Sequence, residues 1–214
     1  MPPCTHLWSD RVVPRLADRA LSTGPVMRLR ARVVAGLRGR VLEVGFGSGL
    51  NVALYPAAVT EVDAVEPSDV GWELSAGRRV RATAPVRRVG LDGQRLEADD
   101  ATYDAVLSTF TLCTIPDAAL ALAEVRRVLR PGGAVHLLEH GLAPSPAVAR
   151  WQRRLDPVQR RVAAGCHLSR DVPALVAGAG LSVDGLTAAY LPGPRVSRPW
   201  GYVYGGVARP VAAP

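Results

Sequence analysis

A short apolar run that ends in a loop with glycine at alternate positions constrains this chain more than any other feature. The stretch reads VLEVGFGSGLN, from Val41 to Asn51, and its glycines are Gly45, Gly47 and Gly49. Glycine adopts positive φ without strain and lets a ligand lie directly on the backbone. The sequence therefore predicts a buried strand whose end is shaped to receive a ligand.

The spacing of these glycines excludes two phosphate-binding loops. The dinucleotide fingerprint needs G-x-G-x-x-G, but its last position falls on Leu50 when counted from Gly45 and on Val52 when counted from Gly47. The other phosphate loop requires a lysine, and the chain contains none. The ligand at the glycines is therefore predicted to be something other than a phosphate group.

Two carboxylates are associated with this loop. Glu43 stands where the strand ends, so that its carboxylate is expected to face the ligand and to favour a cation. The next run, VTEVDAVEPSD, predicts a second strand closed by Glu66, about twenty residues after the loop, where an acidic side chain can accept both hydroxyls of a ribose. S-adenosylmethionine has a ribose, a sulfonium and an α-amino group, and we predict it as the cofactor.

Composition indicates one domain without a disulfide framework. A chain of 214 residues, 48% of them hydrophobic, is long enough for one well-buried domain and short for two. Cys4, Cys113 and Cys166 are an odd number without C-x-x-C spacing, so we expect reduced thiols. Neither Cys4 with His6 nor Cys166 with His167 has the spacing of metal ligands, and no metal is predicted.

The charge and hydropathy of the chain bear on its partners. A net charge of +7 permits contact with nucleic acid, but we interpret the arginines as a solvated surface and expect no nucleic-acid partner. No apolar run approaches about 18 residues and no signal peptide is evident, so we expect a cytoplasmic protein without a membrane span. The oligomeric state is left open.

Short apolar runs alternate with helical patterns, which predicts a mostly parallel sheet covered by helices. The expected strands are Val41–Val44, Val62–Glu66, Val86–Val89, Ala105–Ser108, Val135–Glu139, Leu181–Tyr190 and Tyr202–Val207. A helix is expected over Asp117–Leu129, capped by Asp117. Within VARWQRRLDPVQRRV, Asp156 and Pro157 are predicted to end one helix and begin another.

The order of five motifs resembles the class I S-adenosylmethionine-dependent methyltransferases. These motifs are VLEVGFGSG, VDAVEPSD, LDGQRL, YDAVLSTFTLCTIPD and EVRRVLRPGGAVHLLEH. The resemblance implies a Rossmann-like, seven-stranded, mostly parallel sheet with helices on both faces and an antiparallel last strand. It implies a single domain over residues 1–214, with an N-terminal helical cover (1–39), a cofactor-binding core (40–140), a second helical cover (141–180) and C-terminal strands (181–214).

The resemblance also implies roles for individual residues. Glu43 and Gly45 would sit near the methionine end of the cofactor, Gly47 and Gly49 along the nucleoside, and Glu66 at the ribose. The remaining cofactor-binding residues expected from the family pattern are Asn51, Pro67, Ser68, Asp92, Gly93, Ser108, Thr109 and Phe110.

Further motifs bear on the acceptor. WQRRLDP followed by AGCHLSRD is similar to thiol methyltransferases and their bacterial relatives, near the branch that methylates quinones and phospholipids. We expect a methyltransferase for a small, fairly apolar acceptor, with a thiol ahead of a quinone, phenol or phospholipid amine. An RNA methyltransferase and a non-catalytic cofactor-binding module are the remaining alternatives.

The candidate acceptor residues follow from the same comparison. His140 follows the fifth predicted strand, at the carboxyl edge of the sheet, and is the candidate for a base or a substrate contact. A structural role for His140 is the alternative. Trp8, Cys166 and His167 are candidates for substrate contact, and Trp151 for either the cover or the core.

Overall fold

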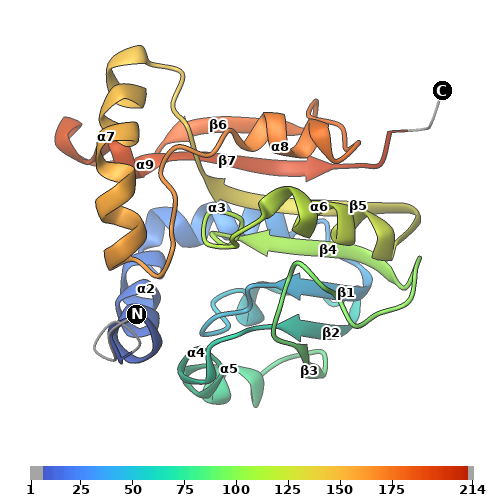
Figure 1. The fold of residues 1–214 in the computed structure, drawn as a ribbon. Helices are drawn as coiled ribbons and strands as arrows, with labels where there is room; N and C mark the ends of the chain where they lie inside the picture. The colour runs from blue at the N-terminus through green and yellow to red at the C-terminus, as the bar shows by residue number, and fades with distance from the viewer. Residues whose placement is uncertain (1–6, 212–214) are drawn as a thin grey trace.

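The computed structural model describes residues 7–211, which form one seven-stranded sheet with helices on both faces (Figure 1). The strand order is β3-β2-β1-β4-β5-β7-β6, and β7 runs antiparallel to both of its neighbours, β5 and β6. The predicted architecture, including the antiparallel last strand, is confirmed. The strands are β1 (Gly39–Val44), β2 (Val59–Val65), β3 (Val86–Gly90), β4 (Tyr103–Thr109), β5 (Leu129–His140), β6 (Leu186–Tyr190) and β7 (Tyr202–Ala208).

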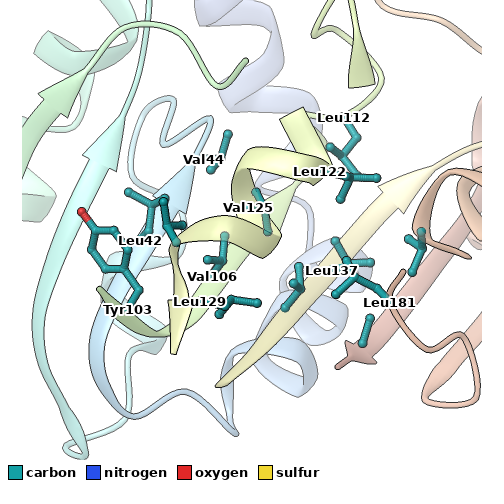
Figure 2. Close-up of a cluster of buried hydrophobic side chains, with 14 of the residues drawn as sticks. Leu42, Val44, Tyr103, Val106, Leu112, Leu122, Val125, Leu129, Leu137 and Leu181 are labelled. Carbon is teal, nitrogen blue, oxygen red and sulfur yellow. The ribbon is translucent and has the colours of Figure 1, made fainter. Parts of the chain in front are cut away.

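Helices pack on the sheet through two separate apolar clusters. In the first cluster, Leu42, Val106 and Leu137 of the sheet pack with Leu122 and Val125 of the helix between β4 and β5 (Figure 2). The second, on the other face, includes Val33 and Val34 near the N-terminus. The α-helices are α2 (Val13–Leu21), α3 (Gly24–Val34), α4 (Asp69–Leu74), α5 (Ala76–Arg79), α6 (Ala118–Val128), α7 (Pro146–Val162), α8 (Val172–Gly178) and α9 (Arg198–Gly201).

Three short turns of other helix types complete the described elements. They are the π-helix η1 (Trp8–Val12) and the 3-10 helices η2 (Val52–Leu54) and η3 (Arg195–Ser197). Among residues 7–211, no helix combines the length and the apolar character that crossing a membrane requires.

The helix α6 forms as the sequence predicts. The Asp117 side chain accepts a hydrogen bond from the Leu120 amide at 2.9 Å, which satisfies one of the free amides of the first turn. Ala121, Val125 and Val128 lie on the buried face, in agreement with their helical spacing.

The helix α7 differs from the prediction, because it continues through Pro157. Asp156 does not cap a new helix there: its carboxylate instead accepts the amides of Leu168 and Ser169, at 2.6 and 3.1 Å. These long-range bonds hold the Asp156 carboxylate against the loop that follows the helix. The prediction of two helices was therefore wrong.

The sixth strand is shorter than predicted. It begins at Leu186, whereas Leu181 forms only an isolated bridge with Pro210. The strand therefore occupies only the second half of the predicted range.

The carboxyl ends of the parallel strands place several predicted residues at one edge of the sheet. The glycine loop follows β1, Glu66 follows β2, Asp92 lies just beyond β3, and Thr109 and His140 end β4 and β5. Ligands of open α/β sheets bind at this edge.

Candidate functional site

A cavity of about 440 Å³ opens at this edge, within the size range of small-molecule sites. Its floor comes from the segments that follow β1, β2, β3 and β4, and one wall comes from α2. The residues that line it are Ser9, Val13, Pro14, Ala17, Asp18, Leu21, Arg30, Val44–Ser48, Leu50, Val65–Ser68, Gly71, Leu91–Gly93, Thr109–Thr111, Thr114–Pro116 and Ala164.

The glycine loop adopts the left-handed backbone that its sequence predicts. Gly45, Gly47 and Gly49 have φ of 73°, 56° and 74°. A Cβ on Gly45 would lie 2.0 Å from Oγ1 of Thr111, so Gly45 allows the loop to pack against the turn after β4. A Cβ on Gly47 would meet no atom within 4 Å, and Gly47 forms an open cradle in the cavity wall.

Gly49 is not a lining residue and packs instead below the loop. A Cβ there would lie 3.1 Å from Cβ of Ser75. Among the three glycines, Gly45 and Gly47 are the two that line the cavity.

Glu66 fixes the loop to the start of α4. Its Oε2 accepts the Gly47 amide at 2.6 Å, and its Oε1 accepts the Ser68 amide at 2.8 Å. Ser68 in turn caps α4 by accepting the Gly71 amide at 3.0 Å. Burial raises the pKa of Glu66, although both amide bonds oppose this shift. Glu66, Pro67 and Ser68 all line the cavity.

A buried polar network lies on the other side of β1. Nη1 of Arg30, on α3, donates to Oγ1 of Thr109 at 2.7 Å and to Oδ1 of Asn51 at 2.9 Å. Asn51 Nδ2 donates to Oε1 of Glu43 at 2.8 Å and to Oγ1 of Thr109 at 3.0 Å, and the Tyr55 hydroxyl donates to Oε2 of Glu43. The network ties α3, the glycine loop and the end of β4 together.

Arg30 is the member of this network that sequence reasoning missed. It lines the cavity while only 4% exposed, and its Nε has no hydrogen-bond partner among the described residues. A buried guanidinium at the cavity wall places a positive charge there, which favours an anionic group in the cavity. No motif surrounds Arg30, because its position depends on how α3 docks against β4.

Glu43 and Asn51 lie behind the cavity wall instead of in it. Both are about 1% exposed, and the two carboxylate oxygens of Glu43 already accept bonds from Asn51 and Tyr55. The expectation that the Glu43 carboxylate faces the ligand therefore differs from the structure. Burial raises the pKa of Glu43 to about 7, although the bonds from Tyr55 and Asn51 and the charge of Arg30 oppose the shift.

The loop after β3 supplies Asp92 and Gly93 to the cavity, as expected. Oδ1 of Asp92 accepts the amide of Gln94 at 2.9 Å and its side-chain nitrogen at 3.0 Å. Gly93 packs tightly below, since a Cβ there would lie 2.9 Å from Cγ1 of Val44.

Of the three residues predicted at the end of β4, two line the cavity and one does not. Thr109 and Phe110 line the cavity, whereas Ser108 points away and donates to Oε1 of Glu139 at 2.7 Å. Neighbouring residues of a strand point to opposite faces, so Ser108 and Thr109 cannot both reach one ligand through their side chains.

The four residues predicted for the acceptor lie outside the cavity lining. Nε1 of Trp8 donates to the Val162 carbonyl at 2.7 Å and joins the N-terminal segment to α7. Nδ1 of His167 lies 3.1 Å from Oδ2 of Asp156, and Nε2 of His140 lies 3.0 Å from Sγ of Cys166. In the described part of the chain, these side chains therefore join separate segments to one another and do not face the cavity.

The pKa values of His140 and Cys166 depend on each other and on their neighbours. Burial alone would lower the pKa of His140, but the Cys166 sulfur and the Glu139 charge raise it above its ordinary value. The pKa of Cys166 is lowered, first by a hydrogen bond with Cys113 and then by the contact with His140.

Trp151 is 55% exposed on α7 and belongs to neither the core nor the cavity.

Comparison with known proteins agrees with this fold. Residues 42–137 match the model of the family described as Methyltransferase domain. The chain is 31% identical over 137 residues to thiol S-methyltransferase TMT1B of Rattus norvegicus, covering 61% of this chain and 55% of that protein. It is 34% identical over 125 residues to phosphatidylethanolamine N-methyltransferase of Cereibacter sphaeroides, covering 56% of this chain and 59% of that protein.

A solved structure shows the same fold at low sequence identity. It is an S-adenosylmethionine-dependent methyltransferase from Thermotoga maritima, described as a possible histamine N-methyltransferase. It is 18% identical, with a TM-score of 0.66 over 95% of this chain and 98% of that one.

The fold, the glycine loop and the family match over residues 42–137 together point to the class I S-adenosylmethionine-dependent methyltransferases. The family match and the fold support S-adenosylmethionine as the cofactor. The chain spans a little over half the length of the two curated relatives named above.

Proposed function

We propose that this chain transfers a methyl group from S-adenosylmethionine to a small, fairly apolar acceptor, and that the preferred acceptor is a thiol. The observation that carries the proposal is one cavity with a carboxylate and a guanidinium on opposite sides of β1. Glu66 stands at the end of β2, and Arg30 contacts the end of β4. A nucleoside joined to an amino acid presents hydroxyls at one end and a carboxylate at the other.

In this proposal each end of the cofactor meets a matching group. The Glu66 oxygens accept the ribose hydroxyls, since each has a second lone pair beyond its amide bond. The guanidinium of Arg30 pairs with the carboxylate of the methionine end, and the open Gly47 cradle admits the nucleoside. Asp92 and Gly93 lie where the adenine would be read.

The division of the chain into segments belongs to the same proposal. Residues 40–140 form the cofactor-binding core, and residues 1–39 and 141–180 form two helical covers. Residues 181–214 supply the C-terminal strands. In support, α2 and Ala164 contribute to the cavity wall, one from each cover.

The titratable residues of the cavity favour an acceptor that ionises without help. Among the described residues, four of them line it: Asp18, Arg30, Glu66 and Asp92. Partial burial of Asp18 would raise its pKa, but hydrogen bonds from Ser48 and Arg78 lower it, which makes the carboxylate a weak base. Glu66 is held by two amides.

A thiol suits such a cavity better than a phenol or an ammonium group. The reference pKa of a thiol is about 8.5, against about 10 for a phenol and about 10.4 for an alkylammonium group. A few per cent of a thiol is therefore already thiolate at neutral pH, and thiolates are strong nucleophiles. The other two acceptors need a proton acceptor that these four residues do not provide.

The chemistry is an in-line displacement. When bound, the cofactor would supply a methyl carbon on a positively charged sulfur for transfer to the thiolate, and that sulfur would be the leaving group. The acceptor proton goes to solvent before the attack. The contribution of the chain is to orient the two reactants and to exclude water, for which α2 and the apolar residues Phe110 and Ile115 are placed.

The test is turnover by the full chain against an acceptor panel. The panel contains an alkyl thiol, an aryl thiol, a phenol, a hydroquinone, phosphatidylethanolamine vesicles and RNA, with methylated products identified by mass spectrometry. We expect thioether products, at rates that rise with the thiolate fraction of each thiol. Products from the phenol, hydroquinone, lipid or RNA alone would assign a different acceptor, and failure to bind the cofactor would refute the proposal as a whole.

A cytoplasmic location is also part of the proposal. In support, Cys113 and Cys166 are free cysteines, and thiols stay reduced in that compartment. Fractionation of the producing cells checks it.

A further inference from the structure

Three side chains with metal-binding atoms converge beside the cavity. Cys113 lies in the turn after β4, His140 ends β5, and Cys166 lies in the loop after α7. One donor atom from each lies within 4.8 Å of the other two, and Nε2 of His140 is 3.0 Å from Sγ of Cys166. Three segments far apart in the sequence thus bring two sulfurs and an imidazole to one point.

We propose that Cys113, His140 and Cys166 form a binding site for a thiophilic divalent cation, with Zn²⁺ as the best-fitting ion. Tetrahedral zinc takes thiolate and imidazole ligands at about 2.3 and 2.0 Å, which sets neighbouring donor atoms about 3.6–3.8 Å apart. Nε2 of His140 and Sγ of Cys166 are 3.0 Å apart, and all three donor atoms lie within 4.8 Å of one another. Small side-chain shifts therefore suffice to close three ligands around an ion.

The imidazole is free to present a lone pair to the ion. Nδ1 of His140 has no hydrogen-bond partner among the described residues. No existing bond therefore opposes the tautomer that carries the proton on Nδ1, and in that tautomer Nε2 is the unprotonated atom facing the sulfurs.

Charge and burial favour a bound cation over free thiolates. Cys113 is 3% exposed and Cys166 and His140 are each 9% exposed, so a lone thiolate here is poorly solvated. Two thiolates with Zn²⁺ form a neutral unit. The charged groups that act on the cluster are Glu139, Asp156 and Arg170, and two carboxylates against one guanidinium also favour a cation there.

The surrounding backbone already holds the ligands in place. The His167 amide donates to the Cys113 carbonyl at 2.8 Å, and the Arg170 guanidinium donates to the Leu112 carbonyl and, at 3.1 Å, to the Pro116 carbonyl. An ion would thus join the loop after α7 to the turn after β4. Thr111, Thr114 and Ala164 of these two segments line the cavity.

Cobalt and zinc binding test the site on the full, reduced chain without methyl donor or acceptor. After removal of metal with a chelator, Co²⁺ is added and the sulfur-to-cobalt charge-transfer band in the near ultraviolet is recorded. Zn²⁺ is then titrated against a chromophoric chelator. We expect one equivalent of either ion, a charge-transfer band, and a rise in Tm with Zn²⁺, because the folded state binds the ion.

Matched variants assign the ligands. Cys113→Ser, Cys166→Ser and His140→Gln should each weaken Zn²⁺ binding at least about a hundredfold and remove the Zn²⁺-dependent rise in Tm. His167→Gln, which alters a histidine outside the cluster, should leave both unchanged. Circular dichroism confirms that each compared variant is folded, and Cys113→Ala and Cys166→Ala replace any serine variant that is not.

Two results would overturn the proposal. One is a reduced wild-type chain that takes up less than half an equivalent of Zn²⁺ or shows no charge-transfer band with Co²⁺. The other is folded cluster variants that bind zinc as tightly as the wild type. Because no methyl transfer is measured, either result leaves the proposed enzymatic function standing, and a failed acceptor panel leaves the zinc site standing.

Discussion

At the scale of single residues, Glu66 has two partners in the chain and a proposed third in the cofactor. It holds the amides of Gly47 and Ser68, and its carboxylate lines the cavity. Glu66→Ala removes a charged acceptor, for which we expect a loss of cofactor affinity of about 1–3 kcal/mol. Isothermal titration calorimetry with S-adenosylmethionine measures it.

Glu61→Ala is the matched control for this change. Glu61 lies near the start of β2, the strand that Glu66 follows, and it pairs there with Arg40 and Arg87 at N···O distances of 3.1 and 2.6 Å. Its removal should leave the affinity within about a factor of two, since exposed ion pairs contribute little. Equal affinities of the two variants would show that Glu66 does not contact the cofactor.

Arg30→Met tests the other end of the proposed cofactor site. In this variant the carboxylate of the cofactor loses its cationic partner, so we expect the dissociation constant to rise at least about tenfold. Arg28→Met, on the exposed side of the same helix, is the control. If both variants bound the cofactor like the wild type, Arg30 would be a structural member of the network only.

The buried Glu43 predicts a dependence of stability on pH. Its pKa is raised from 4.5 to about 7, so between these values the folded chain holds a proton that the unfolded chain has released. The free energy of unfolding therefore falls as pH rises through this window, by up to about 3 kcal/mol from this group. Above the window, the full cost of ionising Glu43 in the folded state remains.

Urea denaturation of the wild type and of Glu43→Gln, at intervals from about pH 4.5 to pH 8, isolates this contribution. The variant lacks the titrating group, so the difference in stability between the two proteins should shift toward the variant as pH rises. Parallel stability profiles would show that Glu43 ionises normally.

Sequence patterns identify residues whose role follows from local chemistry. Gly45, Gly47 and Glu66 are of this kind, because positive φ and the end of a strand are local properties. Arg30 and Asp18 are not, since each reaches the cavity from a helix whose docking no pattern records. Ser108 illustrates a finer limit: its strand is predicted, but which of two neighbouring side chains faces the cavity depends on register.

At the scale of elements, the glycine loop separates two reasons for lacking a side chain. Gly47→Ala places a methyl group in open space and carries only the cost of the left-handed backbone, about 1–2 kcal/mol. Gly45→Ala adds a collision with Thr111 and should be less stable by at least about 2 kcal/mol more. Urea denaturation of both variants measures the difference, and equal losses would contradict the tight packing of Gly45 on Thr111.

The helix α7 shows why one element was predicted incorrectly. Asp156 followed by Pro157 is a helix-start signal when only neighbours in sequence are considered. In the structure the Asp156 carboxylate holds the amides of the loop around Leu168 instead. A tertiary contact of this kind outweighs a local preference, and no sequence pattern reveals it.

At the scale of the whole molecule, the two helical segments proposed as covers are tied both to each other and to the core. Trp8 bonds to Val162 at the end of α7, and Asp18 of α2 accepts the Ser48 hydroxyl at 2.6 Å and pairs with Arg78 at 2.9 Å. Figure 1 shows α2 beside the lower end of α7, at the same edge of the sheet as the cavity. The proposed cover thus combines residues that are distant in sequence.

Deleting residues 1–20 tests whether this cover governs turnover. The deletion removes one cavity wall, including Val13, Pro14 and Ala17, but leaves Glu66, Arg30 and the glycine loop in place. We expect methyl transfer to fall at least about tenfold, because water exclusion and acceptor positioning are lost. Cofactor affinity should fall less, by about 1 kcal/mol, through loss of the bond between Asp18 and Ser48.

The variant Asp18→Ala separates the two effects within the full-length chain. It should reproduce the modest loss of cofactor affinity while keeping most of the turnover at saturating cofactor, since the wall itself remains. Calorimetry and product formation are measured on all three proteins, with circular dichroism to confirm that each is folded. A folded truncated chain that methylated its acceptor at the full-length rate would show that the N-terminal segment is not a cover. Acceptor positioning would then rest with the turn after β4 and the loop that contains Ala164.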